Sequence, residues 1–284
     1  MKPRFGPAGK PPWFKCAMVD VPAFLADEGL DAFEFQAVRM GMPDQVVGAD
    51  RARALKENAQ KNDVRLSLHA PYFVNLPSER AETRRKSVER LISSMRLASW
   101  MGAQQVVFHP GSYGKLFKEN ALRASIEAMR EVIATAQEEG IKNVWLGPET
   151  TGKVTQLGDL GEIITMCEAV ELSRPTVDFA HIHARGQGVI QAKRDYAEIL
   201  EAIEERLGGE VVKNLHCHFT PVEFTQRGEL RHHALGEGGY GPDFEPLAET
   251  IVELGFSPVI ISESPLLDKD AITMRNIVLS KSQS

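Results

Sequence analysis

Short apolar runs alternate with longer amphipathic stretches along most of the chain. The apolar runs are candidate β-strands, at residues 3–6, 32–35, 64–69, 104–109, 143–149, 175–179, 211–219 and 258–263, of which the first is the weakest. Apolar positions that recur every three or four residues predict helices over residues 78–101, 120–139, 157–171, 193–207 and 242–254, with shorter helices over 21–28 and 44–60. Eight strands alternating with helices over 284 residues predict an α/β fold, a (β/α)8 TIM barrel.

A doubly wound sheet is the alternative fold for this pattern. The chain has no G-x-G-x-x-G motif after its first strand and no Walker A motif, which argues against the nucleotide-binding members of that class. No linker, low-complexity segment or repeat beyond the βα unit divides the sequence. We therefore expect a single domain over residues 1–284, with a frayed tail from about residue 280.

The composition is that of an ordinary globular protein, 43% hydrophobic and 25% charged. The net charge of -6 gives no general sign of nucleic-acid binding, although bound divalent ions would offset it locally. Cys16, Cys167 and Cys217 are far apart and form no C-x-x-C pattern, which favours a reducing compartment without disulfides. Because no signal peptide or membrane span is evident, we expect a cytoplasmic protein.

Polar residues stand where the predicted strands end, and that face of a TIM barrel carries the catalytic residues. In chain order they are His69, His109, Glu149, Asp178 with His181 three positions later, the pair His216 and His218, and Glu263. The spacing of 40 residues from His69 to His109, and again from His109 to Glu149, is one βα unit each time. We therefore expect these residues to be neighbours around the barrel rim.

Imidazoles mixed with carboxylates suit Zn2+, Mn2+ or Fe2+ better than Ca2+ or Mg2+. More candidate ligands converge than one ion needs, and a carboxylate such as Glu149 can bridge two ions, as in two-metal phosphodiester hydrolysis. Singly, each residue has a structural explanation: Asp178 as a helix N-cap, Glu263 as a turn acceptor. His181 and His183 can be solvent-facing loop residues, which we expect of His183. Their joint occurrence at successive strand ends favours a metal cluster.

Several ordered motifs add a resemblance to a known family. They are HAPY at 69–72, VFHPGS at 107–112, PETTGK at 148–153, Asp178-x-x-His181 and RHHALGEG at 231–238. Together they resemble the endonuclease IV family over about residues 64–268, and LGPETTGK, HCHF and GELRHH are nearer to its archaeal-type branch. The resemblance implies a zinc-dependent (β/α)8 barrel that cleaves DNA on the 5′ side of abasic sites, leaves a 3′-hydroxyl and uses a cluster of three Zn2+ ions.

Carried over by motif, the resemblance implies three metal sites. The first is held by His69, His109 and Glu149, the second by Glu149, Asp178, a histidine of the seventh strand and Glu263, and the third by His181, His232 and a nearby acidic residue. The context of the seventh-strand ligand favours His218 over His216. Both share one face of that strand, so both can point inward.

The third site departs from the family motif. Leu230, Arg231 and His232 stand where the family has Asp-Arg-His. Either Glu229 or His233 would have to replace the missing aspartate. If neither does, the protein holds two ions, or holds the third weakly.

The resemblance also implies a mechanism and a partner. Glu149 and Glu263 would be the catalytic residues, beside a metal-bound hydroxide that attacks the phosphorus. Tyr72 matches a family position that wedges into the DNA stack, the alternative being simple packing on the rim, and Arg39 is a further candidate for insertion. Phosphate contacts, or merely a solvated helix face, are expected of Arg80, Arg84, Arg85 and Lys86. The expected partner is DNA with abasic sites, bound by a monomer.

Two alternatives belong to other functional classes. Glu149, Asp178, a seventh-strand histidine and Glu263 alone would form the single-metal site of a sugar isomerase or epimerase of the same barrel superfamily. Such an enzyme does not need the remaining histidines as ligands. The other alternative is a barrel that binds damaged DNA or metal without turnover, supported only by the departure at Leu230.

Overall fold

Within residues 2–282, which the computed structural model describes, eight parallel strands form a closed barrel. The strands are β1 (Arg4–Pro7), β2 (Ala32–Gln36), β3 (Arg65–His69), β4 (Gln105–Phe108), β6 (Trp145–Pro148), β8 (Thr176–Asp178), β9 (His216–Phe219) and β12 (Val259–Ser262). They pair as two sheets, β1-β12-β9-β8 and β2-β3-β4-β6. Parallel bridges from Ala8 to Glu34 and from Glu149 to Thr176 join the sheets. The predicted (β/α)8 barrel is confirmed.

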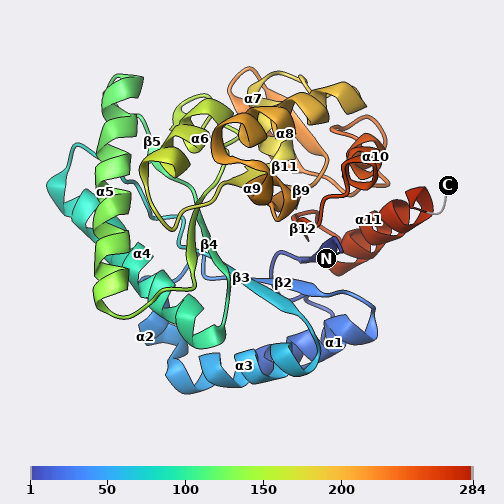
Figure 1. The fold of residues 1–284 in the computed structure, drawn as a ribbon, viewed down its shortest axis with the longest axis horizontal. Coiled ribbons are helices and arrows are strands. Elements are labelled where there is room, and N and C mark those ends of the chain that lie inside the picture. Colours follow the sequence, from blue (N-terminus) through green and yellow to red (C-terminus); the bar gives the residue numbers. More distant parts are fainter. Residues whose placement is uncertain (1, 283–284) are drawn as a thin grey trace.

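Helices surround the barrel (Figure 1). The longer ones are α1 (Val21–Asp27), α3 (Ala49–Lys61), α4 (Ala81–Met101), α5 (Lys118–Glu138), α6 (Leu160–Ala169), α8 (Lys193–Leu207), α10 (Phe244–Leu254) and α11 (Asp268–Lys281). Shorter elements are η1 (Met18–Asp20), α2 (Pro43–Val47), α7 (Phe179–Arg185) and α9 (Gly209–Lys213). In the part of the chain that is described, no helix combines the length and the hydrophobicity needed to cross a membrane.

Side chains alternate between the two faces of each barrel strand. In β9, Cys217 and Phe219 belong to the apolar layer beneath the helices. The alternate residues His216 and His218 are buried inside the barrel, where they contact Glu34 of β2. The strands are mainly apolar in sequence because one face packs on helices. The face that points into the barrel carries polar side chains, which continue to the carboxyl-end rim.

Three segments differ from the predicted elements. The helix expected over 44–60 is two helices, because Gly48 has φ of 79° and separates α2 from α3. The first part of the strand expected over 211–219 belongs to α9, and the strand begins at His216. Helix α11 was not predicted and packs on β1 and α10. It continues to Lys281. Fraying of the tail from about residue 280 stays a prediction, and residues 283–284 lie outside the described part.

Two small antiparallel pairs were also not predicted. One joins β5 (Gly111–Ser112) to β7 (Gln156–Leu157), and the other joins β10 (Val222–Thr225) to β11 (Gly228–His232). Both pairs lie in loops that follow barrel strands on the carboxyl-end side. They extend the barrel at the face where the polar strand ends meet.

Candidate metal centre

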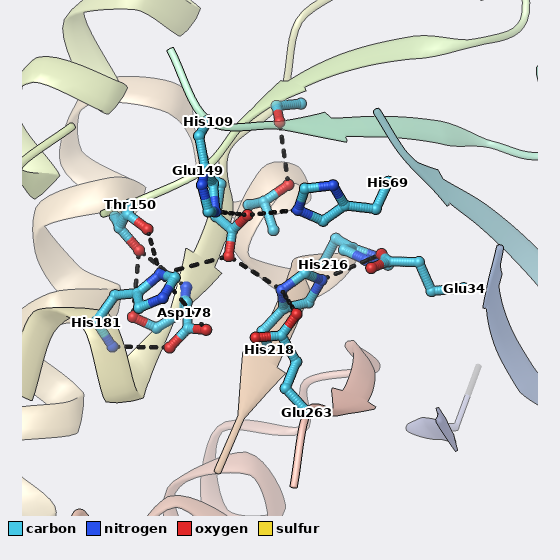
Figure 2. A network of polar contacts seen from close by, with 12 residues as sticks. Glu34, His69, His109, Glu149, Thr150, Asp178, His181, His216, His218 and Glu263 are labelled. Carbon is cyan, nitrogen blue, oxygen red and sulfur yellow. Dashed lines mark hydrogen bonds and ion pairs between the residues drawn. The ribbon is translucent and has the colours of Figure 1, made fainter. Parts of the chain in front are cut away.

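Glu149 lies at the centre of a buried group of acids and imidazoles at the carboxyl ends of the strands (Figure 2). Its Oε2 lies 3.0 Å from Nε2 of His109 and 3.4 Å from Nε2 of His69. Its Oε1 lies 3.0 Å from Nδ1 of His218 and 3.5 Å from Nδ1 of His181. Four of the histidines expected at the rim thus converge on one carboxylate, each from a different strand or the loop after it.

His69, His109 and Glu149 form the first donor set. Nδ1 of His69 lies 2.8 Å from the carbonyl oxygen of Ala70. A carbonyl only accepts, so in the neutral ring Nδ1 carries the proton and Nε2 presents its lone pair to Glu149. The ring of His109 lies edge-on to that of His69, with the centroids 5.3 Å apart.

Glu149, Asp178, His218 and Glu263 form the second donor set. Oδ1 of Asp178 accepts a hydrogen bond of 2.8 Å from the backbone N–H of His181, so Asp178 is indeed the N-cap of α7. Its Oδ2 is buried and has no hydrogen-bond partner. Nδ1 of His218 also lies 3.3 Å from Oε1 of Glu263. The N-cap role of Asp178 therefore uses one oxygen and leaves the other facing the centre.

The third donor set contains His181, His232 and Glu263, whose ligand atoms lie within 4.8 Å of one another. Glu229 lies between the two histidines. Its Oε2 is 3.2 Å from Nε2 of His181, and its Oε1 is 3.2 Å from Nε2 of His232. Glu229 thus contacts both histidines with its carboxylate, whereas Leu230 is 59% exposed.

A β-bulge explains how Glu229 and His232, three positions apart in β11, reach the same centre. In the β10–β11 pair, Glu223 lies opposite Arg231 while Phe224 lies opposite Glu229. Leu230 is thus the extra residue, which restores a shared face for the residues on either side of the bulge. His233 takes another direction, since it contacts Glu237 at 2.6 Å and stacks on Tyr240.

Opposite charges set the ionisation of the centre. Burial disfavours the ionised carboxylate of Glu149, but His218 and His109 hold its pKa well below the ordinary value. Burial likewise disfavours a protonated His218, but Glu34, Glu149 and Glu263 raise the pKa of that imidazole well above its usual range. Glu149 thus remains ionised while His218 holds a proton, which a bound cation would displace.

The donor atoms fit a transition-metal cluster. Three of them are buried and make no hydrogen bond, namely Glu149 Oε2, Asp178 Oδ2 and His232 Nε2, although oppositely charged atoms lie 3.0–3.6 Å from each. Buried polar atoms are normally paired, so these are placed for another partner. The nitrogen–oxygen separations of 3.0–3.5 Å around Glu149 match those between ligands whose bonds to an ion are about 2.0–2.2 Å. The mixed nitrogen and oxygen set suits Zn2+, Mn2+ or Fe2+.

A cavity of about 610 Å³ opens from this centre to the surface. His109, His181, Glu229, His232 and Glu263 reach it from the centre, and Tyr72, Phe73, Lys153 and Gln156 are among its other lining residues. Tyr72 is 57% exposed, with its ring centroid 5.6 Å from that of His109. Tyr72 therefore stands at the mouth of the cavity with most of its side chain available for contact.

The other predicted DNA contacts are not among the residues that line this cavity. Arg39 is exposed in the turn after β2 and does not line the cavity. Arg85 pairs with Glu82 and Glu89, and Lys86 lies 3.0 Å from Glu82. These partners lie three or four positions away on α4, so the structure favours the solvated helix face over phosphate contacts for Arg85 and Lys86. Arg80 is the N-cap of the same helix, Arg84 lies in its first turn, and both are exposed.

One prediction about a histidine is wrong, and one acid of the site was missed. His183 was expected to face solvent but is 5% exposed, because α7 packs it against the loop whose Ile190 N–H donates to its Nδ1. Glu34 was overlooked within the apolar run of β2, although it contacts both His216 and His218. The sequence signal that could have identified Glu34 is a single carboxylate on the inward face of a predicted strand.

Comparison with known sequences gives a family and several relatives. The profile of the xylose isomerase-like TIM barrel family matches residues 22–276. An uncharacterized protein of Methanocaldococcus jannaschii is 34% identical over 228 residues, covering 79% of this chain and 80% of its own. A Shouchella clausii protein named "Probable endonuclease 4" is 27% identical over 209 residues, covering 72% of this chain and 67% of its own.

Solved structures share the fold at low identity. The endonuclease IV of Thermus thermophilus aligns with a TM-score of 0.69 and 22% identity, over 98% of this chain and 100% of that one. A D-tagatose 3-epimerase-like protein aligns with a TM-score of 0.70 and 19% identity, over 94% of each chain. Since nucleases and epimerases match the fold equally well, the function has to be argued from the site.

Proposed function

The chain belongs to the xylose isomerase-like TIM barrel family, and from that premise we propose that it is a metal-dependent endonuclease that hydrolyses the phosphodiester bond 5′ to abasic sites in DNA. One observation carries the proposal: Glu229 completes a third donor set with His181 and His232, next to the two sets that share Glu149. Relatives named as endonuclease 4 support it. Membership of the archaeal-type branch, a monomeric state and a cytoplasmic location stay predictions.

In this proposal the three donor sets hold divalent ions, of which Zn2+ is the expected one. His69, His109 and Glu149 hold the first, and Glu149, Asp178, His218 and Glu263 the second. The third is held by His181 and His232 of the third donor set together with Glu229, while Glu263 of that set serves the second ion. Such ions, when bound, lower the pKa of a coordinated water and neutralise phosphate charge. Glu229 then supplies the carboxylate that the family motif has at the position of Leu230.

The residues of the chain itself supply orientation and access. The hydrogen bond of His69 to the Ala70 carbonyl fixes the imidazole with Nε2 toward the centre. Lys153 lines the cavity and can pair with a DNA phosphate. Tyr72 at the cavity mouth is placed to stack where the abasic nucleotide leaves the duplex, and such a nucleotide has no base to unstack.

A sugar epimerase or isomerase is the second candidate function. The observation that favours it is that Glu149, Asp178, His218 and Glu263 form a complete donor set by themselves. Two glutamates beside a single ion can move a proton next to a carbonyl. The proposal of an endonuclease is preferred because this second candidate leaves His69, His109 and the Glu229 set without a role.

The decisive experiment compares two reactions on one preparation of protein. An abasic duplex and a matched undamaged duplex are incubated with protein as purified, after chelation, and after addition of Zn2+. We expect nicking 5′ to the abasic site only, lost on chelation and restored by Zn2+, with close to three metal equivalents per chain. Intact abasic DNA together with interconversion of ketoses and one equivalent of metal would overturn the endonuclease proposal. Metal binding without either reaction would instead indicate a binding protein.

A further inference from the structure

Glu34 is a fully buried carboxylate inside the barrel that the proposed mechanism does not use. Its Oε2 receives three contacts, from Nε2 of His216 at 2.9 Å, Nε2 of His218 at 3.1 Å and the Ser67 hydroxyl at 3.1 Å. Its Oε1 accepts a hydrogen bond of 2.9 Å from the Gln36 amide. Figure 2 shows His216 and His218 of β9 turned toward Glu34 of β2. A buried carboxylate with this many donors is held in one orientation.

The two nitrogens of His218 face different partners. Nε2 lies against Glu34, whereas Nδ1 lies 3.0 Å from Glu149 and 3.3 Å from Glu263, within the second donor set. A neutral imidazole carries one proton. A hydrogen bond to Glu34 keeps that proton on Nε2 and leaves the lone pair of Nδ1 directed at the position of a cation. Ligand histidines commonly donate their other ring N–H to such a carboxylate.

We propose that Glu34 is a positioning residue, which holds His218 in the Nε2-protonated form and orientation that make Nδ1 a metal ligand. This inference rests on the metal centre of the proposed function and extends it one layer into the barrel. His216 and Ser67 act on Glu34 rather than on the cation, since each directs a hydrogen-bond donor at Oε2. Glu34 touches no substrate and takes no part in bond making.

A separate cation between Glu34, His216 and His218 is the competing interpretation, since their ligand atoms lie close together. It would require His218 to lose both ring protons, because Nδ1 already faces the second donor set. The separations of 2.9 and 3.1 Å are ordinary hydrogen-bond lengths, and Ser67 supplies a further donor to the same oxygen. The contacts therefore favour hydrogen bonding over coordination.

The test measures metal binding rather than catalysis. Protein stripped of metal is titrated with Co2+, with the visible absorption spectrum and competition against a chelator as readouts. We expect Glu34→Gln to weaken one Co2+ site by about 10–100-fold, because the amide does not hold the Nε2 protons as the carboxylate does. Glu162→Gln is the matched control, since Glu162 is also a buried carboxylate with a hydroxyl donor and backbone donors. It should leave Co2+ binding unchanged.

A second measurement needs no variant and guards against misfolding of Glu34→Gln. In the Zn2+-loaded protein with 15N-labelled histidine, nuclear magnetic resonance should show the proton of His218 on Nε2. Unchanged Co2+ affinity in Glu34→Gln, a proton on Nδ1 of His218, or a fourth Co2+ that only Glu34→Gln abolishes would each overturn the proposal. Because DNA cleavage is not a readout, absent endonuclease activity leaves this inference standing, whereas a wild-type protein that binds no Co2+ would overturn both.

Discussion

Nε2 of His232 lies 3.2 Å from Oε1 of Glu229, three positions earlier in the same strand, because Leu230 forms the bulge between them. A regular strand would direct residues three apart to opposite faces. The bulge therefore decides which acid joins His181 and His232. It also explains how a chain with leucine at position 230 retains a carboxylate in this part of the centre.

The Glu229 carboxylate can be tested by substitution. Glu229→Gln should lower the affinity of one metal site by more than the about 10–100-fold typical of an outer-shell partner. The dialysed protein should therefore lose one equivalent of bound metal. Atomic absorption of dialysed protein and the rate of abasic-site nicking would report the loss. Leu230→Ala is the control, because the Leu230 side chain is 59% exposed and should leave the metal content unchanged. Full metal content in Glu229→Gln would remove Glu229 from the centre.

The hairpin that carries Glu229 depends on Gly228. This glycine has φ of 99°, and a Cβ there would lie 2.0 Å from the carbonyl oxygen of Gly152. Gly228→Ala should displace the hairpin and weaken the third site without changing a ligand, at a backbone cost of at least about 1–2 kcal/mol. Gly238→Ala is the control, since a Cβ at Gly238 meets nothing within 4 Å. Equal metal content and equal Tm for the two variants would contradict the expectation.

Tyr72 is expected to contribute to DNA binding and not to metal binding. Tyr72→Ala should weaken binding of an abasic duplex by about 1–3 kcal/mol, the range for one stacking contact with a base. Fluorescence anisotropy with labelled duplex measures this, and the metal content should stay at the wild-type value. Phe117→Ala removes another aromatic ring, 78% exposed at the start of α5, and should have no effect. Identical affinities for wild type and Tyr72→Ala would show that Tyr72 only packs on the rim.

A carboxyl pair outside the metal centre, Glu28 and Asp268, predicts a pH-dependent stability. Burial and the neighbouring Asp268 raise the pKa of Glu28 to about 7, with Lys269 opposing the shift. Because the folded protein binds this proton more tightly than the unfolded chain, the stabilising contribution is complete below the ordinary pKa of a glutamate. It is lost as the pH rises through 7. We expect the Tm to fall between pH 5 and pH 8 in wild type.

Glu28→Gln should flatten that profile and raise the Tm at the alkaline end, since it removes the charge that repels Asp268. Differential scanning calorimetry across the pH range measures both effects. Glu138→Gln, an exposed glutamate near the end of α5, is the control and should keep the wild-type slope. A wild-type slope in Glu28→Gln as well would show that other groups control stability in this range.

The fold and the first donor set follow from local pattern. Each strand is a short apolar run bounded by an amphipathic helix, and this order of elements has few ways to bury its apolar faces other than a closed barrel. His69, His109 and Glu149 end consecutive units of equal length, so the barrel makes them neighbours whatever the details of its packing. The sequence alone therefore determined the barrel and the face on which these three residues meet.

Tertiary structure decided which side chains meet where this depends on the depth of a residue in the barrel or on a local irregularity such as a β-bulge. His216 and His218 share one strand face by the two-residue period. Only the depth of each in the barrel decides that His218 reaches both Glu149 and Glu34, whereas His216 contacts Glu34. Glu229 reaches the centre through a bulge, which is a property of how β10 and β11 pair. The periodicity of a sequence indicates the direction in which a side chain points, but not which residue of another strand lies opposite it. The register and packing of the strands determine that partner.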